Sequence, residues 1–215
     1  MAGNGIYMEI DISDAKQKIE ALRAVHTEKE MNALLRRAVT RTGKHVKTIV
    51  GKDAAKHYEV TQKKVKSYIG APEISGEAGG LGVSCCIPIN GERMSIGGTF
   101  KASGGAPGWS VRKGKRYKIN AKIIKGQGST LPGTMKHQGG NPPFINTSAP
   151  KLNGVAFTRT GKKTKNGKDA IARVVGIGVP QMPINRAEDD VQKDVMDMLM
   201  KRLEAEHNFI ISKCR

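Results

Sequence analysis

Hydrophobic and polar residues alternate with two different periods along this 215-residue chain. From residue 13 to about residue 70, apolar side chains recur every three or four positions, as in amphipathic helices. In the next hundred or so residues the period shortens to two, which is typical of half-buried strands, and the chain's last part returns to the helical period. The sequence therefore predicts an α+β protein. We expect N-terminal helices, one of them long, a central antiparallel sheet or sandwich with long loops, and a C-terminal amphipathic helix packed on the sheet.

The clearest pattern lies between Val174 and Ile211. A strand-like run ends in a turn through Pro180 and Pro183, where proline disfavours α-helix. Asn185 is the expected N-cap of the helix that follows, and three acidic residues fall in its first turn. Its apolar face comprises Val191, Val195, Met198, Leu199 and Leu203. This face needs a surface to cover it, from the same chain or from a neighbouring copy.

The alternation of apolar and polar residues near the N-terminus predicts a short strand or extended arm over residues 1–12, and helices are expected after it. A first helix is expected from Ser13, with Ile19, Leu22 and Val25 facing inward. A capping box of Thr27 and Glu30 then predicts a long helix that reaches about Val50. Its buried stripe comprises Met31, Leu34, Leu35, Ala38, Thr42, Val46 and Ile49. A short helix from Gln62 to Tyr68 is expected after Thr61.

Two hairpins are predicted in the β region. In the first, strands at 81–89 and 94–100 flank Asn90-Gly91, a dipeptide that favours a tight turn. In the second, strands at 155–160 and 170–175 flank a basic tip over 161–168. Between them, Ile119, Ala121 and Ile123 alternate as in a half-buried strand, and Pro142-Pro143 marks an edge or entry before Phe144.

Charge divides the chain into three parts of one composite domain. The N-terminal arm and helical region (1–70) has a net charge of +6, the glycine-rich β region (71–186) +14, and the C-terminal helix (187–215) −2, for a total of +18. A basic region attracts polyanions such as nucleic acid, an anionic membrane or an acidic protein surface. A solvated surface without a partner is the other interpretation.

Two cationic segments are the candidate contact sites for nucleic acid or for another subunit. One comprises Arg112, Lys113, Lys115, Arg116 and Lys118, and the other Lys162, Lys163, Lys165 and Lys168. Both segments are hairpin-like, and the tip at 161–168 is long enough to reach a neighbour or a polyanion, although a merely exposed turn explains it as well.

The sequence contains no persuasive active site, and we expect no catalytic residue, metal or cofactor. The run Gly161-Lys162-Lys163-Thr164 lacks the upstream glycine and following helix of a phosphate-binding loop. Asp53 and His57 lie four residues apart, which is more typical of a surface pair than of a catalytic dyad. Three cysteines make no disulfide framework, and we expect them reduced. Neither a signal peptide nor an apolar run long enough to span a bilayer is visible, so we expect no membrane association.

Several short motifs resemble the phage minor tail protein Z family. They are Leu131-Pro132-Gly133-Thr134, Phe144-Ile145, residues 155–162, Gly178-Val179-Pro180-Gln181-Met182 and Lys201-Arg202-Leu203-Glu204-Ala205-Glu206. The long helix from Glu28 and the basic stretch after Gln62 also lie where that family has them, while residues 76–108 do not match it.

This resemblance implies a virion structural protein without enzymatic activity. It implies a tail-completion or neck protein of a long-tailed phage, made in the host cytoplasm, that forms a homo-oligomeric ring, hexameric in the favoured case, around the DNA channel at the head–tail junction. Its implied partners are the connector, the tail terminator and the tail tube, with non-specific contact to genomic DNA. A freestanding basic nucleic-acid-binding protein is the alternative, although a 4% aromatic content disfavours recognition by base stacking.

Overall fold

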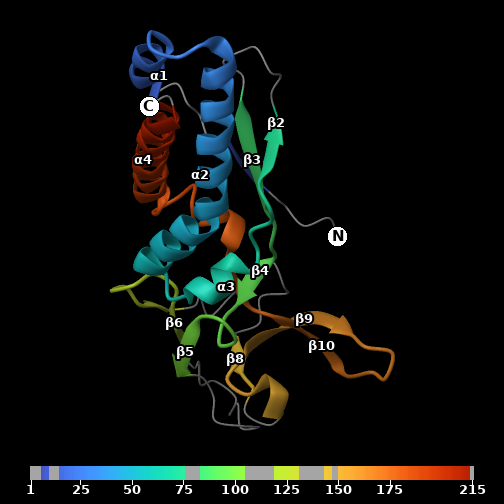
Figure 1. Cartoon of the computed structure of the whole chain (residues 1–215). Coiled ribbons are helices and arrows are strands. Elements are labelled where there is room, and N and C mark those ends of the chain that lie inside the picture. Colours follow the sequence, from blue (N-terminus) through green and yellow to red (C-terminus); the bar gives the residue numbers. More distant parts are fainter. Residues whose placement is uncertain are drawn as a thin grey trace. The chain divides into compact units, whose positions relative to one another are not determined.

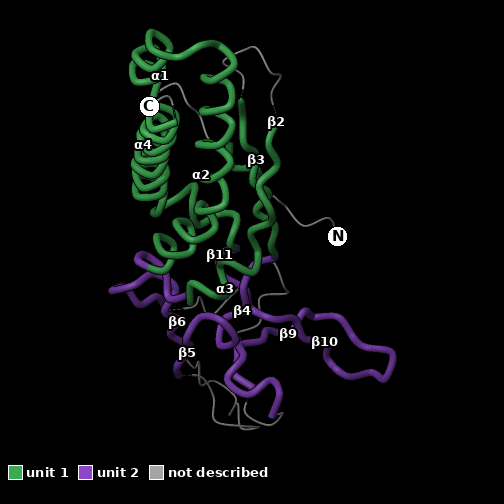
Figure 2. The backbone as a smooth tube through the Cα atoms, viewed as in Figure 1, with its two compact units in different colours: residues 1–55, 61–91, 179–215 green, residues 56–60, 92–178 purple. Residues whose placement is uncertain are grey.

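The computed structural model confirms the α+β class (Figure 1). It describes residues 6–9, 15–75, 83–104, 119–130, 143–146 and 150–213. The chain divides into two compact units (Figure 2). Unit 1 comprises residues 1–55, 61–91 and 179–215, and unit 2 comprises residues 56–60 and 92–178. Instead of one central sheet, the described strands form four small sheets, which are antiparallel throughout.

Unit 1 contains four helices and one small sheet among its described residues. The helices are α1 (Lys16–Arg23), α2 (Glu28–His57, whose last two residues are counted with unit 2), α3 (Gln62–Lys66) and α4 (Glu188–Lys213), with a 3-10 turn, η4 (Val179–Gln181), before α4. The sheet has the order β1-β3-β2, formed by β1 (Ile6–Glu9), β2 (Glu73–Ser75) and β3 (Ser84–Ile89). Figure 1 shows α4 running beside α2.

The long helix α2 begins as the sequence predicts and continues seven residues beyond the predicted end. The hydroxyl and backbone N–H of Thr27 both donate to the Glu30 carboxylate, at 2.8 and 3.0 Å, which forms the predicted capping box. These hydrogen bonds hold the pKa of Glu30 below its ordinary value. Every residue of the predicted stripe is buried. Asp53 is also fully buried, so its predicted place in a surface pair is wrong.

A glycine within α2 allows β3 and the chain before β2 to approach the helix closely. A Cβ atom at Gly43 would lie 2.6 Å from Cys85 Sγ and 3.1 Å from Pro72 Cβ. Both distances are shorter than ordinary van der Waals contact. Cys85 is itself fully buried and has a free thiol, whose pKa is raised by burial. Gly43 is therefore required by space, although glycine weakens a helix.

The C-terminal helix starts two residues later than the predicted cap at Asn185 implies. The Asn185 side-chain amide donates to the Gln181 carbonyl at 2.6 Å instead of capping α4, which begins at Glu188. The predicted apolar face is buried at Val191, Val195, Leu199 and Leu203, and Met198 is half-buried. The predicted turn at Pro180 contains the 3-10 turn η4.

A buried carboxylate on α4 forms ion pairs with α2. Glu206 is 1% exposed and forms ion pairs with Arg37, at 2.8 Å, and with Arg41. More exposed contacts flank it: Lys18–Glu204 and Lys52–Asp194 ion pairs at 3.0 Å, and a His26–His207 hydrogen bond at 2.7 Å. Together these contacts join α4 to α1, to α2 and to the loop between them.

Two further sequence predictions for unit 1 are wrong, and one falls on residues that the structure does not describe. Val25 is 65% exposed because α1 ends at Arg23, so the inward-facing period does not extend to it. Asn90-Gly91 does not close a hairpin: β3 pairs with β1 and β2, and the backbone N–H of Asn90 donates to the Tyr68 carbonyl at 2.9 Å. The predicted helix start at Ser13 lies outside the described residues.

Unit 2 contains the other three sheets. They are β5-β6-β7, β10-β9-β8 and β11-β4. The strands are β4 (Arg93–Ser95), β5 (Lys101–Gly104), β6 (Ile119–Lys122), β7 (Ser129–Thr130), β8 (Phe144–Ile145), β9 (Ala156–Lys163), β10 (Asp169–Arg173) and β11 (Val175–Gly178), with a 3-10 turn, η3 (Pro150–Leu152), before β9. The predicted alternation in β6 and the predicted β9–β10 hairpin are both confirmed, and β8 lies at a sheet edge as its prolines suggest.

The first testable consequence concerns the space at Gly43. Gly43→Ala is expected to lower the free energy of unfolding by about 1–2 kcal/mol, because overpacking outweighs the gain in helix propensity. Cys85→Ala, added to this variant, removes the nearest atom and is expected to recover most of the stability in urea denaturation. Gly128→Ala is the control, since no heavy atom lies within 4 Å of a Cβ there. Equal effects of the two glycine variants, or no recovery, would contradict the close approach.

The second consequence concerns the buried carboxylate. Glu206→Gln is expected to lower the free energy of unfolding by about 2 kcal/mol, because two arginines are left without their charged partner. Glu204→Gln removes an exposed ion pair instead and is expected to cost less than about 0.5 kcal/mol. Thermal and urea denaturation of both variants measure the difference. Indistinguishable stabilities would show that Glu206 does not fasten the helices.

Candidate functional site

The β9–β10 hairpin extends away from the rest of unit 2 (Figures 1 and 2). Its base is buried at Ala156, Phe157 and Thr158, and residues 159–173 are exposed apart from three half-buried positions. We call residues 159–173 the arm. Because most of its side chains are exposed, the described residues of unit 2 leave the arm largely uncovered, as a two-stranded ribbon next to a small core.

The tip of the arm closes through a turn specified by its local sequence. The backbone N–H of Thr164 donates to the Lys168 carbonyl at 2.8 Å, and that of Gly167 donates to the Thr164 carbonyl at 2.9 Å. Gly167 has a φ of +71°, a conformation that glycine adopts without strain. The Thr164–Lys168 hydrogen bond thus encloses three residues, Lys165-Asn166-Gly167, and both strands extend closer to the tip than the sequence predicts.

An irregularity in β9 sets the directions of the lysines. Lys163 pairs with Asp169 and Arg159 with Ile171, so three residues of β9 oppose one residue of β10. Gly161, with a φ of +76°, lies in this bulge. The Thr160 hydroxyl accepts from the Lys162 backbone N–H at 3.3 Å and donates to the Ala170 carbonyl at 3.2 Å. A bulge bends and twists the strand that contains it, which breaks the simple alternation of side chains here.

The arm carries six basic residues and one acidic residue, a net charge of +5. The acidic residue, Asp169, accepts hydrogen bonds from Lys163 at 2.6 Å and from Arg159 at 2.7 Å. These two cations hold the pKa of Asp169 below its ordinary value, with Lys163 contributing most. In the described part of the chain, Lys162, Lys165 and Lys168 are exposed and have no ion pair with a carboxylate.

Four of the predicted contact residues are brought together at the tip: Lys162, Lys163, Lys165 and Lys168. The other predicted set, Arg112, Lys113, Lys115, Arg116 and Lys118, lies outside the described residues. The structure adds Arg159 and Arg173 from the two strands. Alternation within the predicted hairpin could have revealed both, but it could not have revealed that Asp169 neutralises part of the tip.

The chemistry of the arm suits electrostatic contact. Lysine ammonium groups act as mobile point charges on phosphates or carboxylates and do not read base edges. No aromatic residue lies between Arg159 and Arg173, so the arm offers no platform for base stacking. Among the described residues, no group of three or more His, Cys, Asp or Glu side chains could hold a metal ion. Likewise, no described helix is both long and apolar enough to cross a membrane.

The third testable consequence concerns Asp169. Asp169→Asn is expected to delay elution from heparin at neutral pH, because it removes a negative charge and releases Lys163 and Arg159. As the pH falls, the wild-type carboxylate keeps its charge until the pH is below its lowered pKa. The delay should therefore persist at pH 3.8, the ordinary Asp value, and disappear only at lower pH.

Glu92→Gln is the matched control for this experiment, because it removes one exposed acidic charge outside the arm. We expect a smaller delay on heparin for this variant. An equal delay for both variants, or disappearance of the Asp169→Asn effect at pH 3.8 or above, would contradict the role of Asp169 in the arm.

Comparison with known proteins adds no further observation about this arm. The chain matches no protein-family model, no curated protein and no solved structure.

Proposed function

We propose that the chain is a non-enzymatic structural subunit of a tailed-phage virion. It would act as a tail-completion or neck protein, a minor tail protein at the head–tail junction, in a ring around the DNA channel. The observation that carries this proposal is the exposed basic arm. The sequence resemblance to the phage minor tail protein Z family supports the same assignment.

An arm of this kind is best explained by a partner outside its own chain. A two-stranded ribbon is marginally stable in water unless a further strand or surface packs against it. The described residues leave most of the arm exposed, and its tip carries three lysines that have no ion pair among those residues. A neighbouring subunit would cover the ribbon and also remove its open edge.

The charge of the arm is compatible with two kinds of contact in a neck. Lysines facing a channel would attract DNA phosphates whatever the base sequence. This lack of sequence preference suits a channel through which a whole genome passes. Lysines facing a neighbouring subunit would instead meet acidic side chains. We favour a homo-oligomeric ring, hexameric in the simplest case, whose partners are the connector, tail terminator and tail tube.

A freestanding nucleic-acid-binding protein remains the alternative, and the same basic arm is what favours it. The alternative requires tight binding of DNA or RNA by the isolated chain, with an affinity that falls steeply as salt rises. The neck assignment requires instead that the chain be incorporated into particles. Size-exclusion chromatography with light scattering, together with DNA titrations, compares the two for purified protein.

The fourth testable consequence is that the chain is present in purified virions or tails. Quantitative mass spectrometry should find it at a fixed copy number per particle, and cross-linking should join it to other neck or tail proteins. Its absence from every particle fraction would overturn the assignment, and tight salt-sensitive DNA binding by the monomer would then favour the alternative.

Replacing the three tip lysines with glutamine tests whether they meet DNA. If Lys162, Lys165 and Lys168 bind phosphates, the slope of log affinity against log salt should fall by roughly one unit for each lysine that is replaced. Replacing Lys122, Lys125 and Lys151, which are exposed elsewhere in unit 2, removes the same charge away from the arm. Equal slopes for the two triple variants would assign the tip lysines to protein contact or to solubility.

A further inference from the structure

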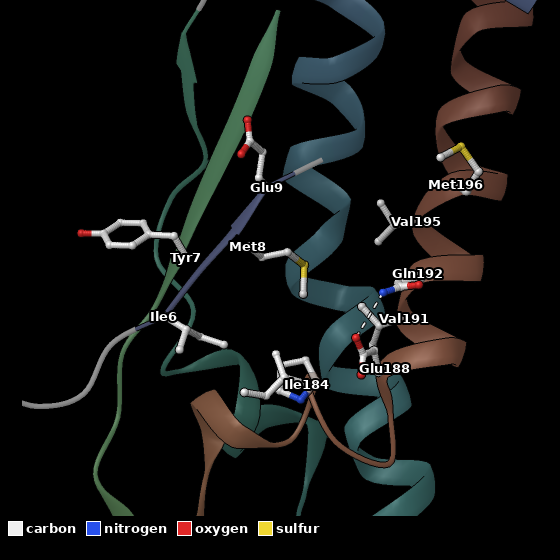
Figure 3. Close-up of a pocket in the computed structure, with 11 residues that line it drawn as sticks. Ile6, Tyr7, Met8, Glu9, Ile184, Glu188, Val191, Gln192, Val195 and Met196 are labelled. Atoms are coloured by element: carbon white, nitrogen blue, oxygen red, sulfur yellow. Dashed lines mark hydrogen bonds between the residues drawn. The ribbon is translucent and has the colours of Figure 1, made fainter. Parts of the chain in front are cut away.

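An open groove of about 370 Å³ lies between β1 and the first half of α4 in unit 1 (Figure 3). Much of its lining is apolar: Ile6, Met8, Pro183, Ile184, Val191, Val195 and Met196. Figure 3 shows Met8 directed from β1 toward α4. Two exposed carboxylates, Glu9 and Glu188, also line the groove. It is therefore an apolar groove with the Glu188 carboxylate at α4, while Glu9 adds a negative charge at the rim, on the outward side of β1 (Figure 3).

The groove lies beside the most acidic part of the chain. Within residues 188–197 there are five acidic residues and one basic residue, a net charge of −4 in a chain whose total is +18. The acidic residues are Glu188, Asp189, Asp190, Asp194 and Asp197. An extended segment of opposite charge would be attracted here before any apolar contact forms.

Exposed apolar side chains remain around this groove. Tyr7 is 73% exposed and Ile184 is 52% exposed, although both line the groove. β1 is an edge strand of the sheet β1-β3-β2, and no described strand pairs with its other edge. Edge strands with exposed apolar neighbours are surfaces on which another extended segment packs.

The arm of unit 2 has the complementary properties. It is extended, has a net charge of +5, and carries Lys162, Lys165 and Lys168 at its tip. Ile171, on β10, is 52% exposed among these charges. Each copy of the chain therefore carries one basic segment with an apolar residue and one acidic groove with an apolar lining.

We propose that the groove between β1 and α4 binds the arm of a second copy of this chain. Ile171 contacts the apolar lining, and tip lysines pair with Glu9 and Glu188. Because arm and groove are different surfaces, the contact is head-to-tail, and its repetition closes a ring when the rotation between copies permits. This inference rests on the proposed function for its biological setting, since it names the contact that joins subunits of the ring.

The experiment uses the full chain with benzoylphenylalanine in place of Ile171. Equal amounts of ¹⁴N- and ¹⁵N-labelled protein are mixed at high concentration, irradiated, digested and analysed by mass spectrometry. We expect mixed-isotope pairs that join the arm to peptides containing β1 or the first half of α4. Cross-links found only between peptides with the same label would show that the arm contacts its own chain and not a second copy. That result, cross-links to other peptides, or none, would overturn the proposal.

Charge exchange tests the same contact independently. The arm variant carries Lys165→Glu with Lys168→Glu, and the groove variant carries Glu9→Lys with Glu188→Lys. Each variant alone should lower the mixed-isotope yield by about fivefold or more. When the two are mixed, cross-links from the arm variant to the groove variant should recover, because the exchanged charges again attract one another. Failure to recover would overturn the pairing of these charges.

Matched controls separate this contact from net charge and from misfolding. Lys122→Glu with Lys125→Glu changes the charge of unit 2 away from the arm, and Glu20→Lys with Glu73→Lys does so in unit 1 outside the groove and its acidic surroundings. Both should cross-link as the unaltered protein does, and circular dichroism melting should show that every variant is folded. An equal decrease in the controls would overturn the proposal.

The outcome is distinguishable from that of the proposed function. If the chain is found in virions but the arm does not cross-link to the groove, the contact is wrong and the neck assignment stands. If the arm cross-links to the groove but the chain is absent from virions, the assignment is wrong and self-assembly through the arm stands.

Discussion

Unit 1 depends on one buried carboxylate. Glu206 lies on α4 between two arginines of α2, and a charge this deeply buried is stable only while its partners remain in place. These two ion pairs therefore restrict how far α4 can slide or rotate along α2. The Val191 and Val195 side of the groove is part of the same helix, so its position beside β1 follows from this contact.

Sequence reasoning succeeded where the deciding interactions are local. The capping box of Thr27 and Glu30, the buried stripe of α2 and the β9–β10 hairpin each depend on residues a few positions apart. It failed at Asn90-Gly91, where pairing of β3 with the distant β1 replaced a favourable local turn. It also missed the burial of Glu206, because a glutamate in a helix is ordinarily exposed and its partners lie more than 160 positions away.

The candidate site was predictable as a charge pattern but not as a geometry. Lysine spacing alone indicated a basic tip at residues 161–168. The bulge at Gly161 and the pairing of Asp169 with Lys163 and Arg159 depend on strand register, which a sequence specifies weakly where both faces are exposed. As a result, the four predicted lysines differ: one is held by a carboxylate, and three are available to a partner.

The closed turn at Lys165-Asn166-Gly167 has a practical consequence for limited proteolysis. Exposed loop tips are the preferred sites of proteolytic nicking, and this tip offers lysyl bonds to trypsin. Trypsin is therefore expected to cut the isolated chain at this tip, whereas a tip seated in the groove of a second copy, as proposed above, would be shielded. The rate of that cut would then report, without any label, the fraction of tips that are covered.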